Sequence, residues 1–317
     1  MTTPSEFEQI DQMMSKRALK KSRRKWRFIA FAALAIAVVA LVGRSLGGFS
    51  NPVGNEGPHI ARVVIDGVIT SDPQRRQILN DLASDENVTG VIVQINSPGG
   101  TTAGGEELYE GLRAIGENKP VTAVINELGA SAAYMTAIGA DKIYARRLSI
   151  VGSIGVLIQH MDASKLLDTI GIDYDKVATG PLKAEPDIDE PMSPLVRRSY
   201  QKLVDDSFAW FVDIVAERRN LPRDEVLLLA DGQIMTGRMA LENKLIDEIG
   251  DEITAKAWME NEAETADQKV HTYYPLPQEP WENIGYWMST QLGSLFINRL
   301  NNTQTLDGLV SVWQPIE

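Results

Sequence analysis

The sequence predicts an α/β protein with a largely parallel sheet, and three observations support this prediction. Short runs rich in β-branched residues, such as "VTGVIVQINS", are typical of buried strands. They alternate with stretches of helical periodicity, such as "AGGEELYEGLRAIG". The chain has 317 residues and is 44% hydrophobic, so it can bury a sizeable core. We therefore expect strands and helices to alternate along most of the chain.

The body of the protein is expected to begin near residue 61, after the Gly- and Pro-rich stretch "GGFSNPVGNEGP". Strands are predicted at 61–69, 88–97, 121–127, 141–145, 149–157 and 172–178. Helices are predicted at 103–120, where Pro120 ends the helix, at 163–171, at 194–219 and after Pro222. The sequence contains no internal repeat.

Positive charge is concentrated at the N-terminus. The first 27 residues hold eight basic and three acidic side chains, a net charge of +5, and the rest of the chain carries a net charge of −17. The uncharged run "FIAFAALAIAVVALVG" follows, and as a helix it would rise roughly 24 Å, a little short of a ~30 Å hydrocarbon core. Basic residues before such a run favour a cytoplasmic N-terminus. We therefore expect a transmembrane signal anchor at 28–46, with the bulk of the chain on the far side.

A cleaved signal peptide is the alternative interpretation of the N-terminus. Its basic region would be long, and no clear A-x-A cleavage site follows the apolar run. A buried soluble helix fits less well, because nothing polar interrupts the run. The predicted segments are a basic cytoplasmic segment 1–27, the anchor 28–46, a linker 47–59, the body 60–260 and a partly helical C-terminal extension 261–317.

Two loops that follow predicted strands are candidate ligand sites, because open α/β sheets bind ligands at the carboxyl ends of their strands. In "INSPGGTTAGG", Gly99 and Gly100 let backbone N–H groups approach a ligand closely, as an oxyanion hole requires. An ordinary tight turn is the alternative for this glycine pair. In "NELGASAAY", Ser131 opens a helix among small side chains, where the helix N-terminus favours negative charge. Ser131 is therefore a candidate nucleophile, with a helix N-cap as the alternative role.

A serine nucleophile needs a group that accepts its proton. The three histidines, His59, His160 and His271, form no convincing Ser/His/Asp order. A lysine can serve instead if burial lowers its pKa from ~10.4 toward ~7 to 8. Lys183, in the loop "GPLKAEPD", is the candidate, and a solvated surface charge is the alternative.

Five separated segments carry a resemblance to a known family: "INSPGG", "ELGASAAYMTAIGADKIYA", "SIVGSIGV", "GPLKAEPD" and "DGQIMTGRMALENKLIDEIG". In this order, across residues 60–255, they resemble the bacterial signal peptide peptidase A family of membrane-anchored serine proteases. The resemblance implies the Clp protease/crotonase fold, with a spiral core of repeated ββα units, preceded here by one transmembrane helix. It also implies that Ser131 is the nucleophile and Lys183 the general base of a Ser/Lys dyad. The amides of Gly100 and Ala132 would form the oxyanion hole.

The same resemblance implies the surroundings of the reaction. Substrates would be peptides, namely remnant signal peptides and other membrane-associated or misfolded polypeptides. The catalytic domain would lie on the periplasmic side of a bacterial inner membrane. No metal, nucleotide or other cofactor is needed, and no nucleic acid is expected as a partner. Ser153, in "VGSIGV", is a candidate hydroxyl that orients the lysine, with a strand-end serine in a turn as the alternative.

Two other classes of function remain open. A crotonase-like acyl-CoA enzyme would use the same oxyanion architecture, but it would be expected in the cytoplasm, which the anchor argues against. A non-catalytic membrane scaffold would keep the core and lose the dyad, yet Ser131 and Lys183 are both present.

Two features depart from the family pattern. Four carboxylates follow Lys183 closely, and because nearby carboxylates favour the charged ammonium, we expect them to point away from the dyad. They are Glu185, Asp187, Asp189 and Glu190. The extension 261–317 lies outside the matching motifs. Its apolar stripe at 284–300 is expected to form a helix that packs on the body or on a neighbour, with membrane contact as the alternative.

The resemblance also bears on assembly. Longer members of the family hold two copies of this fold, with the lysine in the first copy and the serine in the second. A chain with one copy resembles half of such a site. We therefore expect a closed homo-oligomer in which Ser131 of one protomer meets Lys183 of its neighbour across a head-to-tail interface.

Overall fold

The computed structural model describes residue 31 and residues 57–262, 267–274 and 310–312. By its internal contacts the chain divides into two units, Met1–Glu56 and Gly57–Glu317. The expected anchor, apart from Phe31, and the apolar stripe at 284–300 lie outside the described residues. Among the residues that are described, no helix combines the length and the hydropathy needed to cross a bilayer.

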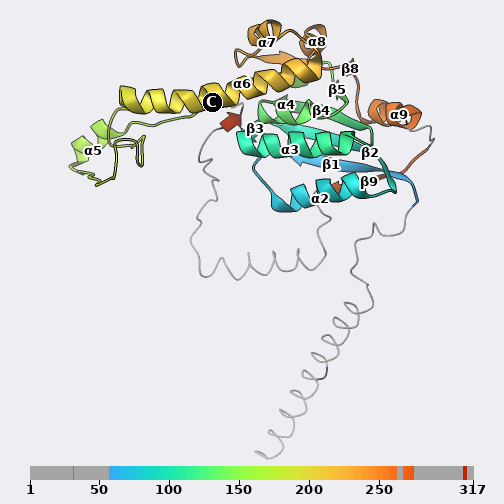
Figure 1. Ribbon diagram of the computed structural model, residues 1–317, viewed down its shortest axis with the longest axis horizontal. Helices are drawn as coiled ribbons and strands as arrows, with labels where there is room; N and C mark the ends of the chain where they lie inside the picture. The colour runs from blue at the N-terminus through green and yellow to red at the C-terminus, as the bar shows by residue number, and fades with distance from the viewer. Residues whose placement is uncertain (1–30, 32–56, 263–266, 275–309, 313–317) are drawn as a thin grey trace, which may run out of the picture. The chain divides into compact units, whose positions relative to one another are not determined.

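An eight-stranded sheet forms the centre of the second unit (Figure 1). Its order is β7-β6-β4-β2-β1-β9, while β5 pairs with β4 and β8 pairs with β5. Within the described part of this sheet, every pair is parallel except β6 with β7. The strands are β1 (His59–Asp66), β2 (Val88–Ser97), β4 (Val121–Ala130), β5 (Lys142–Ala145), β6 (Ile150–Gly152), β7 (Ile234–Thr236), β8 (Glu248–Ile249) and β9 (Val270–Tyr274). The expected α/β class with a largely parallel sheet is confirmed.

Two short strands form a separate antiparallel pair. They are β3 (Gly99–Thr101), which follows β2 after Pro98, and β10 (Val310–Val312), near the end of the chain. This pair brings the C-terminal segment beside the predicted "SPGG" loop.

Helices pack on both faces of the sheet because the strand side chains alternate between two apolar clusters. On one face, Val63, Val93 and Ile125 belong to the cluster that also holds buried residues of α3, α4 and α6. On the other face, Ile92 and Val124 pack with α9. The helices are α2 (Pro73–Ser84), α3 (Thr102–Gly116), α4 (Ala132–Ala137), α5 (Ser164–Ile170), α6 (Pro194–Arg219), α7 (Arg223–Leu229), α8 (Gly237–Glu242) and α9 (Glu252–Glu262).

The long helix α6 begins and ends as its sequence predicts. The hydroxyl of Ser193 accepts a hydrogen bond from the N–H of Val196, and Pro194 occupies the first turn, where its missing donor costs nothing. At the other end, Asn220 adopts the left-handed conformation, with φ 51°. The predicted helix 194–219 is therefore confirmed.

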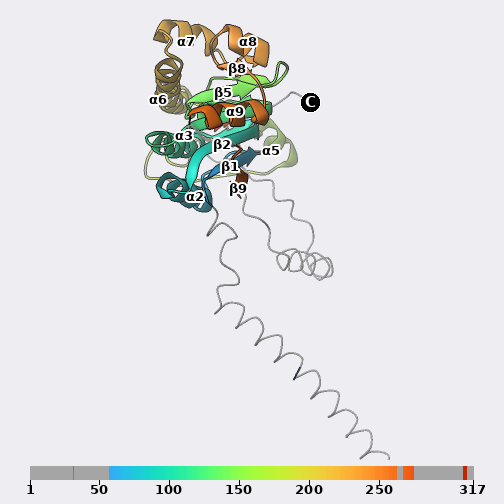
Figure 2. The ribbon, with the colours of Figure 1, turned by 90° about the vertical axis from the view of Figure 1, so that its right-hand side faces the viewer.

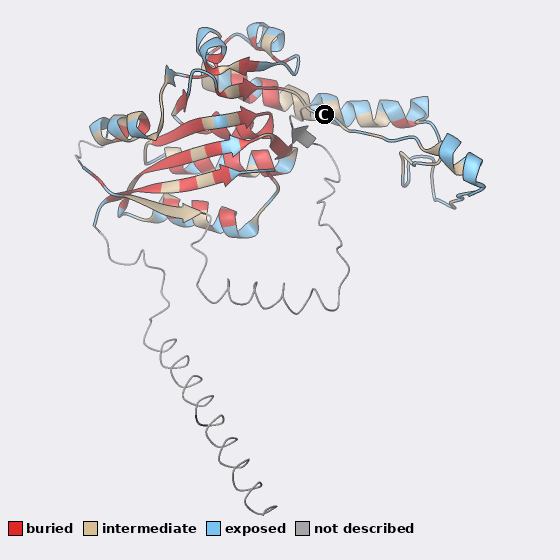
Figure 3. Cartoon of the chain, turned by 180° about the vertical axis from the view of Figure 1, so that it is seen from behind, coloured by how far each residue is buried: buried red, intermediate tan, exposed pale blue. Residues whose placement is uncertain are grey.

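The segment between β6 and the middle of α6, residues 155–203, forms what we call the arm. Between Gly155 and Leu195, a fully described stretch, no residue is buried, and α5 contributes nothing to a core. Figures 1 and 3 show α5 and the loop that follows it at the far end of α6 from the sheet. Many apolar side chains of the arm are exposed, among them Met161, Leu166, Ile170, Ile172, Tyr174, Val177 and Ile188.

The prediction of a strand at 172–178 is wrong. That segment is irregular and lies in the arm, where Ile172, Tyr174 and Val177 are exposed. A β-branched run forms a strand only where a sheet edge accepts its backbone groups, and the arm offers none in the described protomer. Helix α2 was not predicted from the sequence. Only Leu79 and Leu82 are its buried apolar residues, so its periodicity is weak.

Candidate active site

Ser131 lies where β4 ends and α4 begins, and its backbone is strained. Its φ is 59° and its ψ is −120°, a region that residues with a side chain rarely adopt. Such a conformation costs on the order of 1–3 kcal/mol and persists only where the surroundings enforce it. The residue is 1% exposed, and its N–H donates to the carbonyl of Gly152 at 2.8 Å. Its hydroxyl makes no capping bond to α4, so the alternative role of helix N-cap does not explain this serine.

The helix after Ser131 is held tightly by small residues. All six residues of α4 are buried. A Cβ on Gly105 of α3 would lie 2.8 Å from Sδ of Met135 and 3.1 Å from Cβ of Ala132, so α3 approaches α4 closely only because that position is glycine. Ala132 is the first residue of α4, and the N–H of such a residue has no acceptor within its own helix.

Gly100 lies in β3, pressed against the segment after β1. A Cβ on Gly100 would fall 1.8 Å from the carbonyl oxygen of Ile69, so no other residue fits. The N–H of Ile69 donates to Gly99 and the N–H of Thr101 donates to Ile69, both at 2.8 Å. Backbone groups of a strand alternate in direction, so the N–H and C=O of Gly100 point to the opposite edge. On that edge β10 pairs with β3, with Ser311 opposite Gly100.

The structure brings four of the five predicted site residues to one end of the sheet. Ser97, at the end of β2, is in register with Gly129 of β4, and Ala130 is in register with Gly152 of β6. The loops that carry Gly100, Ser131 with Ala132, and Ser153 therefore meet. Ser153 is 8% exposed, has a φ of 51°, and donates from its N–H to Gln233 at 2.7 Å.

Lys183 is not brought to this end of the sheet within the protomer. It lies in the arm, in the loop between α5 and α6, and it is exposed. Its N–H donates to the carbonyl of Gly180 at 3.1 Å, which closes a turn. Figure 1 shows α4 on the sheet and α5 well away from it, and Figure 2 shows strands β5, β2 and β1 of that sheet from the side. Within the described fold of one protomer, Ser131 and Lys183 therefore do not lie together.

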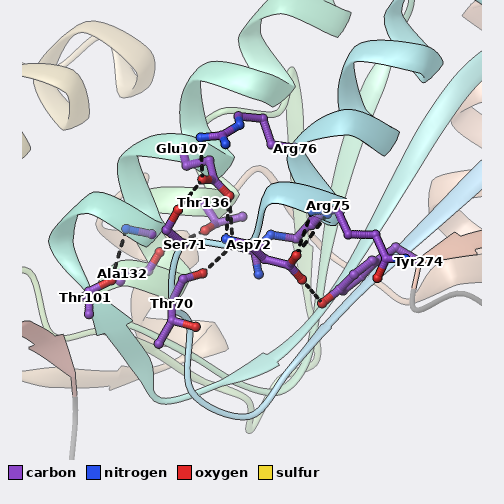
Figure 4. Close-up of polar contacts among 12 residues, drawn as sticks. Thr70, Ser71, Asp72, Arg75, Arg76, Thr101, Glu107, Ala132, Thr136 and Tyr274 are labelled. Atoms are coloured by element: carbon purple, nitrogen blue, oxygen red, sulfur yellow. Dashed lines mark hydrogen bonds and ion pairs between the residues drawn. The ribbon is translucent and has the colours of Figure 1, made fainter. Parts of the chain in front are cut away.

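A polar network that sequence reasoning missed braces the glycine loop (Figure 4). Glu107 of α3 accepts from the hydroxyl of Ser71 at 2.7 Å and from the N–H of Asp72 at 3.1 Å. Arg75 donates to Glu107 at 3.3 Å and to the carbonyl of Thr70 at 2.6 Å. The ion pair is largely buried, with side chains 6% and 9% exposed. The network fixes residues 70–72, directly after the Ile69 that holds Gly100.

Within the described ranges, no cluster of three or more His, Cys, Asp or Glu side chains could hold a metal ion. Burial raises the pKa of the Tyr134 hydroxyl, which therefore stays protonated in the helix that follows Ser131.

Comparisons with known proteins assign the family. The profile of Peptidase family S49 matches residues 113–266. A candidate protease of Synechocystis is 35% identical over 201 residues, which are 63% of this chain and 72% of that protein. The chain belongs to peptidase family S49. Another candidate protease, from Methanocaldococcus jannaschii, is 29% identical over 308 residues, 90% of this chain and 98% of that one.

Other relatives carry more specific names. Protease 4 of Haemophilus influenzae is 33% identical over 68% of this chain, but the match covers only 32% of that longer protein. A solved structure of a ClpP1 point mutant from Listeria monocytogenes aligns with a TM-score of 0.39 and 14% identity, over 60% of this chain and 91% of that one. The expected membership of the signal peptide peptidase A family is confirmed, and the chain is a peptidase by family. The S49 profile spans Ser131, Ser153 and Lys183 and begins after Gly100.

Proposed function

We propose that this protein is a membrane-anchored serine endopeptidase that works with a Ser/Lys dyad. One observation carries the proposal: Ser131 is a buried serine held at φ 59° on a strand-to-helix turn. Strain of this kind collects at functional sites, and a sharp strand-to-helix turn is how hydrolases of other folds present a serine nucleophile. Because the chain belongs to a peptidase family, we infer that this serine attacks peptide bonds.

The proposed reaction follows from the roles of four residues. The neutral amine of Lys183 takes the hydroxyl proton while Oγ of Ser131 attacks the peptide carbonyl. The N–H groups of Gly100 and Ala132 hold the negative charge that forms on the carbonyl oxygen. The Lys183 ammonium returns the proton to the departing amine, leaving an acyl-enzyme. Water then attacks the acyl-enzyme while Lys183 takes its proton, and Lys183 returns that proton to Oγ of Ser131 as the acid leaves.

An extended peptide fits the edge at which this chemistry would occur. The chain's own segment Val310–Val312 pairs antiparallel with β3, so this edge accepts a strand through main-chain groups. Recognition by strand addition reads backbone more than side chains, which suits an enzyme acting on varied polypeptides. We propose remnant signal peptides and other membrane-associated polypeptides as substrates. The basic N-terminus and apolar run support an inner-membrane anchor with a periplasmic catalytic domain.

The lysine is proposed to come from a neighbouring protomer. Lys183 lies on the arm, whose apolar side chains are exposed, and a head-to-tail neighbour would cover them. Each interface would then bring one serine and one lysine together. A site shared in this way is complete only in the assembly.

Mixing two inactive chains tests both the dyad and its sharing. Ser131→Ala and Lys183→Ala should each lose peptidase activity alone. Unfolded together and refolded in equal amounts, they should recover roughly a quarter of wild-type activity, the fraction of interfaces in a random ring that join an intact serine to an intact lysine. A mixture that stays inactive at every ratio contradicts sharing, and turnover by either single variant contradicts the dyad.

Covalent labelling separates the peptidase from the other two functional classes. A fluorophosphonate probe should modify Ser131 in the wild-type chain and leave Ser131→Ala unmodified. A non-catalytic scaffold or an acyl-CoA enzyme on this fold has no activated serine at this position, so neither would be labelled there.

A further inference from the structure

The ammonium of Lys176 lies between two carboxylates in the loop that carries Lys183. Its Nζ is 2.6 Å from Oε1 of Glu185 and 3.0 Å from Oδ2 of Asp187. The carboxylate side chains are only 9% and 16% exposed, although the arm around them is open. We call Lys176, Glu185 and Asp187 the lysine clamp.

The clamp also holds the main chain next to Lys183. Lys176 donates to the carbonyl of Ala184 at 3.4 Å. Tyr200, reaching from α6, donates to the carbonyl of Glu185. The backbone after Lys183 is therefore tied to two separate parts of the arm, while the Lys183 side chain itself remains exposed.

The charges of the clamp matter for the proposed general base. A base must be neutral when it accepts a proton, and carboxylates nearby favour its protonated form. Glu185 and Asp187 follow Lys183 by two and four residues in the same loop. In the clamp both are engaged by Lys176 instead. The two carboxylates raise the pKa of Lys176, so the clamp cation persists at neutral pH.

Lys176 is the main counter-charge of this loop. The hydrogen bond from Lys176 lowers the pKa of Asp187, and the charge of His160 contributes less to the same shift. The other titratable groups of the loop, besides Lys183, are Asp173, Tyr174, Asp175, Asp189 and Glu190, and those of the segments beside it include Asp162, Lys165, Asp168 and Tyr200. Removing Lys176 would therefore leave two carboxylates near Lys183 without their partner.

We propose that Lys176 is a positioning residue for the general base: by engaging Glu185 and Asp187, it keeps both carboxylates from stabilising the ammonium of Lys183. The proposal rests on the proposed function, in which Lys183 takes the proton of Ser131. It explains how a lysine followed by an acidic stretch can still serve as a base.

Chemical labelling tests the clamp without relying on catalysis. In the full-length chain with Ser131→Ala, acetylation of Lys183 by acetic anhydride is followed by mass spectrometry across pH, because only the free amine reacts. Lys176→Met should move the half-reactive pH of Lys183 upward by roughly one unit, the size expected from an uncompensated carboxylate near a protein surface. Lys176→Arg should restore the wild-type profile. Lys202→Met, which removes an exposed lysine from the same arm, should leave it unchanged. A Lys176→Met profile that superimposes on wild type overturns the proposal.

Kinetics with intact Ser131 separates charge from support of the loop. In Lys176→Met, the ascending limb of kcat/KM against pH should move to higher pH. Adding Glu185→Gln and Asp187→Asn should bring it back, because the carboxylates leave together with their counter-ion. If Lys176→Met and the triple variant both lose activity by the same factor at every pH, Lys176 only supports the loop. That result also overturns the proposal. A failed dyad is recognised separately, by turnover in Lys183→Ala, and the labelling experiment still decides on the clamp.

Discussion

The phenolic hydroxyl of Tyr134 donates to the carbonyl of Leu245 at 2.8 Å, which ties the helix after Ser131 to the segment before β8. Both residues are fully buried. We expect Tyr134→Phe to lower the free energy of unfolding by about 1–3 kcal/mol, because the carbonyl of Leu245 loses its side-chain donor in a dry environment. Urea unfolding measures this. An unchanged midpoint and slope would show that water reaches this carbonyl.

Gly100→Ala should lower kcat/KM by roughly a hundredfold, the scale of losing one oxyanion-hole donor. The new Cβ would displace β3, since it would lie 1.8 Å from the carbonyl oxygen of Ile69. Gly237→Ala is the matched control, with a Cβ 2.1 Å from the carbonyl oxygen of Arg146. Both variants should be destabilised in urea, but only the first should lose activity beyond its loss of folded protein. A folded Gly100→Ala enzyme with full turnover would refute the oxyanion role.

Glu107→Gln should lower the free energy of unfolding by about 3 kcal/mol, because the buried guanidinium of Arg75 loses its counter-ion. Among the folded molecules, kcat should fall more than KM changes, since the network fixes the segment that holds Gly100. The neighbouring, exposed Glu106→Gln serves as the control. Wild-type stability in Glu107→Gln would mean that the pair contributes nothing net.

Asp72→Asn should lower stability at neutral pH and lose this effect in acid. Burial raises the pKa of Asp72, but hydrogen bonds from Tyr274 and from the amides of Arg75 and Gln74 outweigh it, so the pKa lies below its ordinary value of 3.8. A depressed folded pKa gives stability that is present above the unfolded value and is lost as pH falls through the folded one. Asparagine caps helices as well as aspartate does, so the substitution isolates the charge. Urea titrations between pH 3 and pH 7 should show the two curves converging below about pH 4; a constant difference contradicts the assignment.

Ser311→Pro should lower KM for peptide substrates several-fold. Pairing with β3 places Ser311 opposite Gly100, and proline removes the N–H that this pairing uses. A peptide would then no longer compete with a strand of the same chain for the edge. Ser311→Ala keeps the backbone donor and should behave as wild type. Equal KM values for the two variants would show that β10 does not obstruct the edge.

The sequence predicted those parts of the fold that local chemistry determines. Helix α6 carries such local signals, because Ser193 caps its first turn, Pro194 follows, and Asn220 ends it in the left-handed conformation. Helix α2 has a similar start signal, Asp72 before Pro73. Its residues are mostly polar, so the sequence shows little apolar periodicity of a helix. The strand expected at 172–178 failed because strands depend on partners far away in sequence, which a local pattern does not contain.

The site was predictable to a similar extent. Small residues after a strand marked the turn at Ser131, and a glycine pair marked the loop of Gly100. The backbone strain at Ser131 comes from tertiary packing, and no residue type in the sequence indicates it. The clamp could not be predicted from the sequence, because Lys176 contacts Glu185 and Asp187 across an irregular loop, where no helical or strand spacing relates the three residues. Catalytic roles and the sharing of the site remain predictions.

The uneven packing of α6 bears on when a newly made chain becomes an active protease. Its C-terminal half buries Phe211, Val212, Ile214 and Val215, while its first half buries only Val196. Local opening is easiest where few side chains are packed, so amide hydrogens of the arm should exchange with deuterium far faster than those of the sheet. On the proposed arrangement, Ser131 of a newly made protomer would already lie in a packed site, while Lys183 would lie on the sparsely packed arm. Such a chain would be a latent protease, switched on when neighbours assemble around it and silent while it is alone.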